Sequence, residues 1–98
     1  MEKITPPRVR VLATGQKLIT KMMEADPGAL LPRHYADLES VVFVHEGEIS
    51  LQLGEEFINL SAGEAQTIPP DVTHQIRAIT AFKGVHLMPN EIKFTFLR

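Results

Sequence analysis

The residues best suited to chemistry lie in the stretch from His34 to Leu51, HYADLESVVFVHEGEISL. In it, a histidine and several acidic residues lead into an apolar, strand-like run that ends at a glycine turn. A second histidine, His74, follows Pro69 closely, so it can face inward at the mouth of a barrel, opposite another histidine. Imidazole is the commonest metal ligand, and two or three imidazoles with a carboxylate suit iron, manganese, zinc or nickel. The pattern indicates a metal site or a pocket with another use on the wall of a barrel.

A purely structural role fits the same two histidines, as half-buried side chains hydrogen-bonded to the backbone or to water. His45 lies at odd parity from Ser40 on the same expected strand, so we expect it to face away from the pocket. His86 lies in a strand whose register the sequence does not reveal. The chain has no cysteine, no G-x-S-x-G elbow and no glycine-rich phosphate loop, so the catalytic residues, if there are any, stay unassigned.

The composition is that of one small globular domain spanning residues 1–98, with residues 1–7 as a loose lead-in. The ten Lys and Arg residues are scattered and the net charge is -2, so we predict no nucleic-acid partner. Apolar runs are far shorter than the roughly 20 residues needed to span a bilayer, so we predict no membrane association. MEKITPPRVR has no apolar core of a secretory signal, and a cytoplasmic location follows as the expectation.

Alternation of apolar and polar residues recurs along the chain, whereas no long segment carries a helical period. Turn residues separate the alternating runs at short intervals, which is typical of an antiparallel sandwich or a closed barrel. We therefore predict an all-β fold, a small antiparallel β-barrel or jelly-roll-like sandwich. The expected strands are Val9–Ala13, Lys17–Ala25, Ser40–His45, Glu48–Leu53, Glu56–Leu60, Ala65–Ile68, His74–Ala78, Phe82–Met88 and Ile92–Leu97.

The segment GEAQTIPPDVTH, which begins at Gly63, resembles the second motif of the cupin superfamily, written G-x5-P-x-G-x2-H-x3-N. Glycine, proline and histidine match at Gly63, Pro69 and His74, while Asp71 replaces the second glycine and Ala78 the asparagine. The earlier stretch resembles the first motif, G-x5-H-x-H-x3,4-E-x6-G, at its beginning, where Gly28 and His34 match, and at its end, where Gly47 matches. The resemblance implies a cupin fold, a small single-domain barrel that is often dimeric, with a pocket between its sheets.

Metal-binding cupins take two histidines and a glutamate from the first motif and one histidine from the second. Carried over to this chain, His34 and His74 match two ligands, but Ala36 and Ser40 stand where the second histidine and the glutamate belong. Glu39 is one residue away, and a slip of one residue turns a strand side chain to the opposite face. Glu39 can therefore complete a metal set with His34 and His74 only if a bulge re-aims it or the strand begins after it.

The first functional hypothesis is a stand-alone cupin whose pocket binds a small organic molecule without a complete metal site. The alternatives are a metal-dependent oxygenase or isomerase that uses His34 and His74 with a divalent metal, and a dimeric interaction module with a vestigial pocket. A homodimer through the terminal strand, made sticky by Phe94 and Phe96, or through a sheet face is expected. The predicted ligand pocket consists of His34, Ala36, Ser40, Val42, His74 and Ile76.

Overall fold

Residues 2–97 are described by the computed structural model, and they form ten strands and no helix. All nine expected strands are present, with bounds shifted by no more than a few residues. No helix in this part of the chain has the length and apolar character to cross a bilayer, and the cytoplasmic location stays a prediction. The strands are β1 (Arg8–Thr14), β2 (Leu18–Ala25), β3 (His34–Ala36), β4 (Ser40–Glu46), β5 (Glu48–Leu53), β6 (Glu56–Ser61), β7 (Ala65–Ile68), β8 (His74–Ala78), β9 (Phe82–Pro89) and β10 (Phe94–Phe96).

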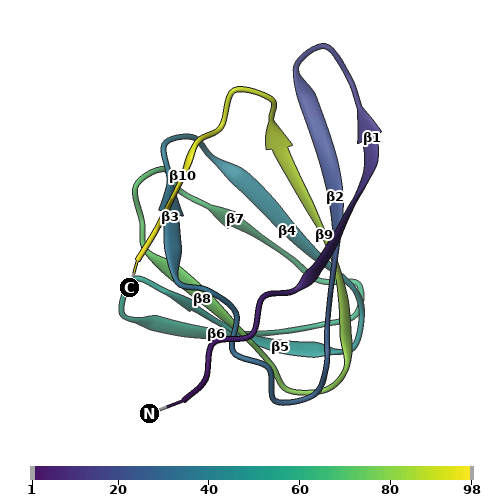
Figure 1. The fold of residues 1–98 in the computed structure, drawn as a ribbon, viewed down its shortest axis with the longest axis vertical. Coiled ribbons are helices and arrows are strands. Elements are labelled where there is room, and N and C mark those ends of the chain that lie inside the picture. Colours follow the sequence, from purple (N-terminus) through teal and green to yellow (C-terminus); the bar gives the residue numbers. More distant parts are fainter. Residues whose placement is uncertain (1, 98) are drawn as a thin grey trace.

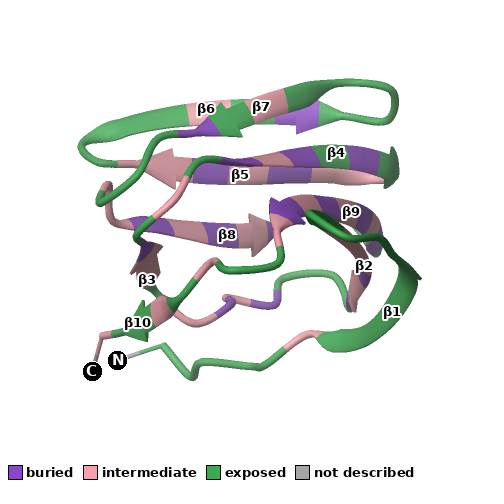
Figure 2. Ribbon diagram, turned by 90° about the horizontal axis from the view of Figure 1, so that it is seen from above, coloured by how far each residue is buried: buried purple, intermediate pink, exposed green. Residues whose placement is uncertain are grey.

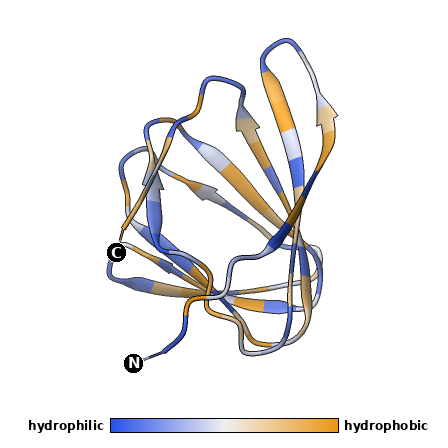
Figure 3. Cartoon of the chain, viewed as in Figure 1, coloured by the Kyte–Doolittle hydropathy of each residue, from blue (hydrophilic) through white to orange (hydrophobic). Residues whose placement is uncertain are grey.

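The strands form two five-stranded sheets, in the orders β1-β2-β9-β4-β7 and β10-β3-β8-β5-β6. Every pair of neighbours within a sheet is antiparallel. The two sheets face each other as the layers of a sandwich, and the chain crosses repeatedly between them (Figures 1 and 2). The turns that connect the strands are largely hydrophilic and the strands carry most of the apolar residues (Figure 3). The predicted all-β, jelly-roll-like sandwich is confirmed.

Strand β3 is the one element that the sequence did not predict as a strand. It has only three residues, HYA, and pairs with β10 along its length and with β8 through His34 and His74. Both partner strands are distant in sequence, and three residues are too few for an alternation of apolar and polar residues to predict β3. Tertiary pairing therefore makes this short segment a strand, and it brings the two histidines into register.

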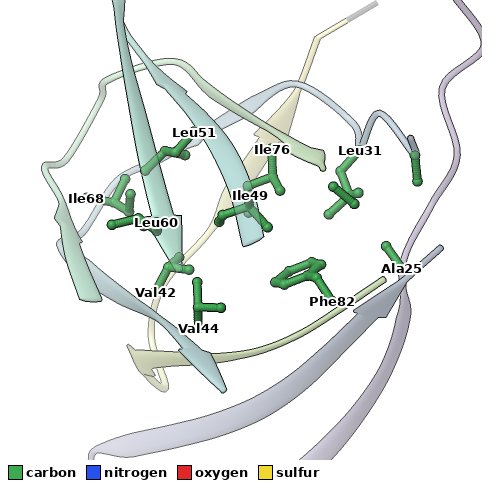
Figure 4. Close-up of a cluster of buried hydrophobic side chains, with 12 residues drawn as sticks. Ala25, Leu31, Val42, Val44, Ile49, Leu51, Leu60, Ile68, Ile76 and Phe82 are labelled. Carbon is green, nitrogen blue, oxygen red and sulfur yellow. The ribbon is translucent and has the colours of Figure 1, made fainter. Parts of the chain in front are cut away.

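The hydrophobic core fills the end of the sandwich where β4 and β7 face β5 and β6. Val44, Ile49, Leu51 and Ala78 are fully buried there, and the Phe82 ring closes the cluster on the side of β9. Figure 4 shows Val44 and Phe82 of one sheet on the side of the cluster that faces Ile49 and Leu51 of the other. Strands β1 and β10 lie at the opposite end of the sandwich from β6 and β7 (Figure 2), and a cavity opens there.

The segment expected as a loose lead-in contacts the barrel. The amide of Thr5 donates a hydrogen bond of 2.8 Å to the carbonyl of Leu30, and Ile4 forms a parallel bridge with Leu30. Pro6 and Pro7 then cover the open end of the sandwich. Backbone hydrogen bonding thus holds this part of the lead-in in place, and Met1 lies outside the described residues.

Asp71 and Gly47 are two of the motif positions that have a left-handed backbone conformation. Asp71, which stands where the resembling motif has a glycine, has φ of 62°, and aspartate is one of the few residues that tolerate this region. Gly47 has φ of 89°, and a Cβ at this position would collide with the carbonyl oxygen of Ala81 and the Thr80 side chain. The β4–β5 turn therefore requires glycine for two separate reasons.

Replacing Gly47 by alanine is expected to lower the free energy of unfolding by about 3 kcal/mol or more, because left-handed strain and overpacking each cost about 1–3 kcal/mol. Gly63→Ala is the matched control, since its φ is 90° but nothing lies within 4 Å of the added methyl group. It should lose only about 1–2 kcal/mol. Urea unfolding followed by circular dichroism measures both, and equal losses would contradict the steric explanation.

Candidate functional site

A cavity of about 350 Å³ lies between the two sheets at the open end of the sandwich. Its walls come from β1, β2 and β9 on one side and from β3, β8 and β10 on the other. The polar members of its lining are Lys21, His34 and His86. The remaining lining residues are apolar: Pro6, Pro7, Val9, Met23, Leu31, Pro32, Ile76, Met88, Phe94 and Phe96. A volume of this size is at the lower end of the range for small-molecule sites, about 300–1,000 Å³.

His34 and His74 form a contacting pair at the side of this cavity. They are register partners on β3 and β8, and their ring centroids lie 4.3 Å apart at an interplanar angle of 62°. His34 lines the cavity, whereas His74 is buried behind it. The two histidines predicted from the two motifs are therefore neighbours in space.

Both rings are oriented in the same way by the backbone. Nδ1 of His34 lies 3.1 Å from the carbonyl oxygen of Pro32, and Nδ1 of His74 lies 3.0 Å from that of Val72. A carbonyl only accepts, so each Nδ1 carries the proton and donates it. Each neutral ring therefore keeps a lone pair on Nε2, which can accept a hydrogen bond or bind a metal.

Burial keeps both imidazoles neutral near pH 7. Desolvation lowers the pKa of His34 below the usual 6.5, and the neighbouring His74 lowers it further, while the bond to Pro32 opposes the shift. Desolvation likewise lowers the pKa of His74 against the effect of its Val72 hydrogen bond. Unprotonated rings at the cavity wall act as hydrogen-bond acceptors and add no positive charge.

His86 is a third histidine of the site, and sequence reasoning could not place it. It lies on β9, buried beside β4, and its Nε2 is 2.9 Å from Oγ of Ser40. Burial lowers the pKa of His86 to about 4, with smaller contributions from His34, His74 and Lys21. The sequence signal for this position is the alternation along β9, in which Phe82, Gly84, His86 and Met88 all face inward. Without the neighbouring strands, the sequence does not reveal which set of alternate residues faces the interior.

Two aromatic rings from the last strand complete the wall. Phe94 and Phe96, on the same face of β10, have ring centroids 5.4 Å and 5.0 Å from that of His34. Phe94 also lies 5.9 Å from the His86 ring. The sequence predicts these phenylalanines as a sticky edge for dimerisation, and the structure places both in the cavity lining. Their i, i+2 spacing is the sequence signal for a shared face.

The six residues predicted for the pocket occupy different depths. His34 and Ile76 line the cavity, and His74 lies directly behind His34. Ala36, Ser40 and Val42 face the interior, with exposed fractions of 2%, 4% and 2%, but do not line the cavity. Val42 belongs to the packed core. Motif spacing predicted the inward direction of these side chains, but not the depth to which the core fills the barrel.

Glu39 is not brought to the histidines. It is exposed, whereas Ser40, the first residue of β4, is buried. The strand therefore does begin after Glu39, but the Glu39 side chain remains exposed. His45 is exposed as well. Among residues 2–97, no group of three or more His, Asp or Glu side chains is placed to hold a metal ion. Catalytic metal sites commonly supply three protein ligands, so the donor set here does not fit a catalytic metal, and the role of Glu39 as a ligand is not supported.

The chain matches the cupin domain family over residues 21–88. No curated protein sequence matches it. A cupin 2 domain-containing protein from Halorhodospira halophila has a similar structure, with a TM-score of 0.88 at 19% identity over 100% of this chain and 73% of the other.

Two further solved structures share the fold. An uncharacterized conserved protein with a double-stranded beta-helix domain from Klebsiella pneumoniae has a TM-score of 0.84 at 18% identity, covering 100% of this chain and 90% of that one. Salicylate 1,2-dioxygenase from Pseudaminobacter salicylatoxidans has a TM-score of 0.82 at 15% identity, covering 92% of this chain and 30% of the enzyme. At these identities the similarities establish the fold alone.

The buried His86 should make folding stability sensitive to acid. The unfolded chain takes up this proton near the usual pKa of 6.5, whereas the folded protein resists protonation until about pH 4. Unfolding is therefore increasingly favoured as the pH falls from 6.5 to 4, and stability is regained as the pH rises through that window. We expect His86→Gln, which can keep a hydrogen bond to Ser40, to remove about 2 kcal/mol of this acid destabilisation at pH 4.5.

Urea unfolding at pH 7.5 and at pH 4.5 gives the free energy of unfolding at each pH, and the difference between the two values measures the acid destabilisation. His45→Gln is the control, because it removes an exposed histidine from the adjacent strand β4. Parallel losses of stability in the wild type and in His86→Gln would contradict the assignment of the acid sensitivity to His86.

Proposed function

We propose that this chain, which belongs to the cupin domain family, binds a small organic molecule in the cavity lined by His34, His86 and Lys21. The observation that carries the proposal is the cavity itself, about 350 Å³ of space with a mostly apolar wall and a few convergent polar groups. This combination is typical of small-molecule sites. A site that served only to pack the barrel would be filled, as the other end of the sandwich is.

The orientation of the histidines supports the same role. The Nδ1–H of His34 is held by the carbonyl of Pro32, so its Nε2 lone pair has a fixed direction. A hydroxyl or amide N–H of a bound molecule can donate to it. An acceptor with a fixed direction selects among ligands of similar shape, because a ligand without a matching donor leaves a buried group unpaired.

The metal-dependent alternative has one supporting observation and one obstacle. Both His34 and His74 present Nε2 with Nδ1–H bound to a carbonyl, which is how ligating histidines are commonly oriented. Two nitrogen donors are fewer than a catalytic metal needs, and His86 already shares a hydrogen bond with Ser40. Organic-ligand binding therefore explains the site better than an oxygenase or isomerase reaction at a metal.

A thermal-shift screen tests the proposal. The panel contains small metabolites of neutral, cationic and anionic classes, with Fe, Mn, Zn and Ni ions in separate wells. A ligand present at about 100 times its Kd stabilises the folded state by about 2.7 kcal/mol, which corresponds to roughly 10 °C or more for a domain of this size. We expect at least one organic compound to raise the melting temperature without added metal.

Two tryptophan variants locate the binding site. Val9 lines the cavity and Val11 does not, although both lie on β1 with similar exposed fractions of 53% and 54%. Val9→Trp should fill the mouth of the cavity and abolish the ligand-induced rise in melting temperature. Val11→Trp should retain that rise. A shift seen only with a metal ion would support the enzyme alternative, and no shift with any compound would favour the interaction module.

We further propose that two copies associate through the outer face of the sheet β1-β2-β9-β4-β7. Its centre carries the cross-strand pairs Val41–Leu87 and Phe43–Val85, none of them covered by another layer. At one end of the sheet, Lys83 lies within ion-pair distance of Glu24 and of Glu46. A symmetric copy would therefore place apolar centre on apolar centre, with these flanking charges already paired.

Sedimentation velocity tests this contact. The wild type should sediment as a dimer of 11.0 kDa subunits. Phe43→Glu should yield the monomer, because it places a charge at the centre of the proposed interface. Phe57→Glu is the control, since Phe57 is 71% exposed on β6 of the opposite sheet, whereas Phe43 is 37% exposed. A dimer that survives Phe43→Glu would exclude this face as the interface.

A further inference from the structure

In the part of the chain that the structure describes, the cavity lining carries one cationic side chain, and no acidic side chain pairs with it. Lys21 lies on the inner face of β2, opposite His86 on β9, and lines the cavity. The ion pairs formed by residues 2–97 involve Arg8, Arg77, Lys83 and His45, and Lys21 takes part in none of them. The lining that the structure describes contains no Asp or Glu.

The other polar groups of the cavity do not neutralise this charge. His34 and His86 are unprotonated near pH 7 because burial lowers the pKa of each ring. They contribute neither a negative charge nor a second positive one. Among residues 2–97, the cavity lining therefore holds a single unit of positive charge, which a ligand with one negative charge would balance. A dianion would leave a negative charge in largely apolar surroundings, which is costly.

The apolar part of the cavity lining favours a ligand with a flat, apolar ring. Phe94 and Phe96 border the cavity beside the His34 ring, and Met23 and Met88 line it from the other sheet. Aromatic rings pack well edge-to-face or offset against one another, and methionine sulfur makes favourable contacts with rings. An aromatic ligand would gain from these contacts more than a polar or sugar-like ligand would.

From this arrangement we infer that the ligand is a small aromatic carboxylate whose carboxylate pairs with Lys21 and whose ring packs between Phe94, Phe96 and Met23. The inference rests on the proposed function, since it names the chemical class of the molecule that this cavity binds. Lys21 is the specificity-determining residue, because it distinguishes the carboxylate from an uncharged compound of the same shape.

Three probes separate the contributions of charge and ring. Phenylacetate carries both features, phenylacetamide keeps the shape without the charge, and acetate keeps the charge without the ring. Isothermal titration calorimetry on the full chain should show phenylacetate binding about tenfold more tightly than phenylacetamide, since a charge-assisted hydrogen bond contributes roughly that much. Acetate should bind more weakly than both.

Lys21→Met should remove the tenfold preference, so that phenylacetate and phenylacetamide bind with similar affinity. Lys17→Met is the matched control, because it removes the same charge from an exposed position outside the cavity lining. Lys21→Arg should keep the preference. A melting curve of each variant checks that it is folded, and the comparison of probes on the wild type does not depend on any variant.

Equal affinity of the wild type for phenylacetate and phenylacetamide would overturn the inference while leaving the proposed function intact. Failure of both aromatic probes to bind would also overturn it, and the metabolite screen would then decide separately whether the cavity binds other organic molecules. A preference for phenylacetate that survives in Lys21→Met would show that another group carries the recognition.

Discussion

The structure depends on the way β9 is held between β2 and β4. Both edges of this strand are paired, so its register is set from two sides, and every second residue faces the interior. Phe82 closes the core, and Gly84 leaves room for its ring, since a Cβ at Gly84 would collide with the aromatic edge. His86 and Met88, further along the same face, line the cavity. One strand thus contributes to both the packed end and the open end of the sandwich.

The unequal filling of the two ends follows from the side chains available. Between β4, β5, β6 and β7, aliphatic side chains from both sheets interdigitate and leave little space. At the end formed by β1, β2, β3 and β10, two histidines and a lysine stand among prolines, methionines, aliphatic side chains and aromatic rings, and these residues leave a cavity between the sheets. Polar groups in such a place need hydrogen bonds, and two backbone carbonyls and the Ser40 hydroxyl supply them to the three rings.

Ser40 illustrates how the site departs from the metal-binding pattern that it resembles. At the position where a glutamate would present a charged ligand, a hydroxyl instead shares a hydrogen bond with His86. A carboxylate beside that ring would favour its protonation, whereas a neutral hydroxyl leaves desolvation as the dominant influence on its pKa. Lys21 faces the same cavity and forms no ion pair with the residues that the structure describes, so it gives the site a positive electrostatic character. In that same part of the chain, no three His, Asp or Glu side chains are placed to hold a metal ion.

Much of this could be predicted from the sequence. Alternation and turn residues predicted the all-β sandwich, because strand periodicity is a local property that the chain carries by itself. The glycine, proline and histidine spacings identified the cupin motifs and the pairing partners His34 and His74. What only the tertiary structure decided was the short strand β3, the inward parity of His86, the place of Phe94 and Phe96 in the cavity wall, and the exposed position of Glu39. Each of these depends on which distant strands pair and how deeply the core fills the barrel, and no local pattern in the chain contains that information.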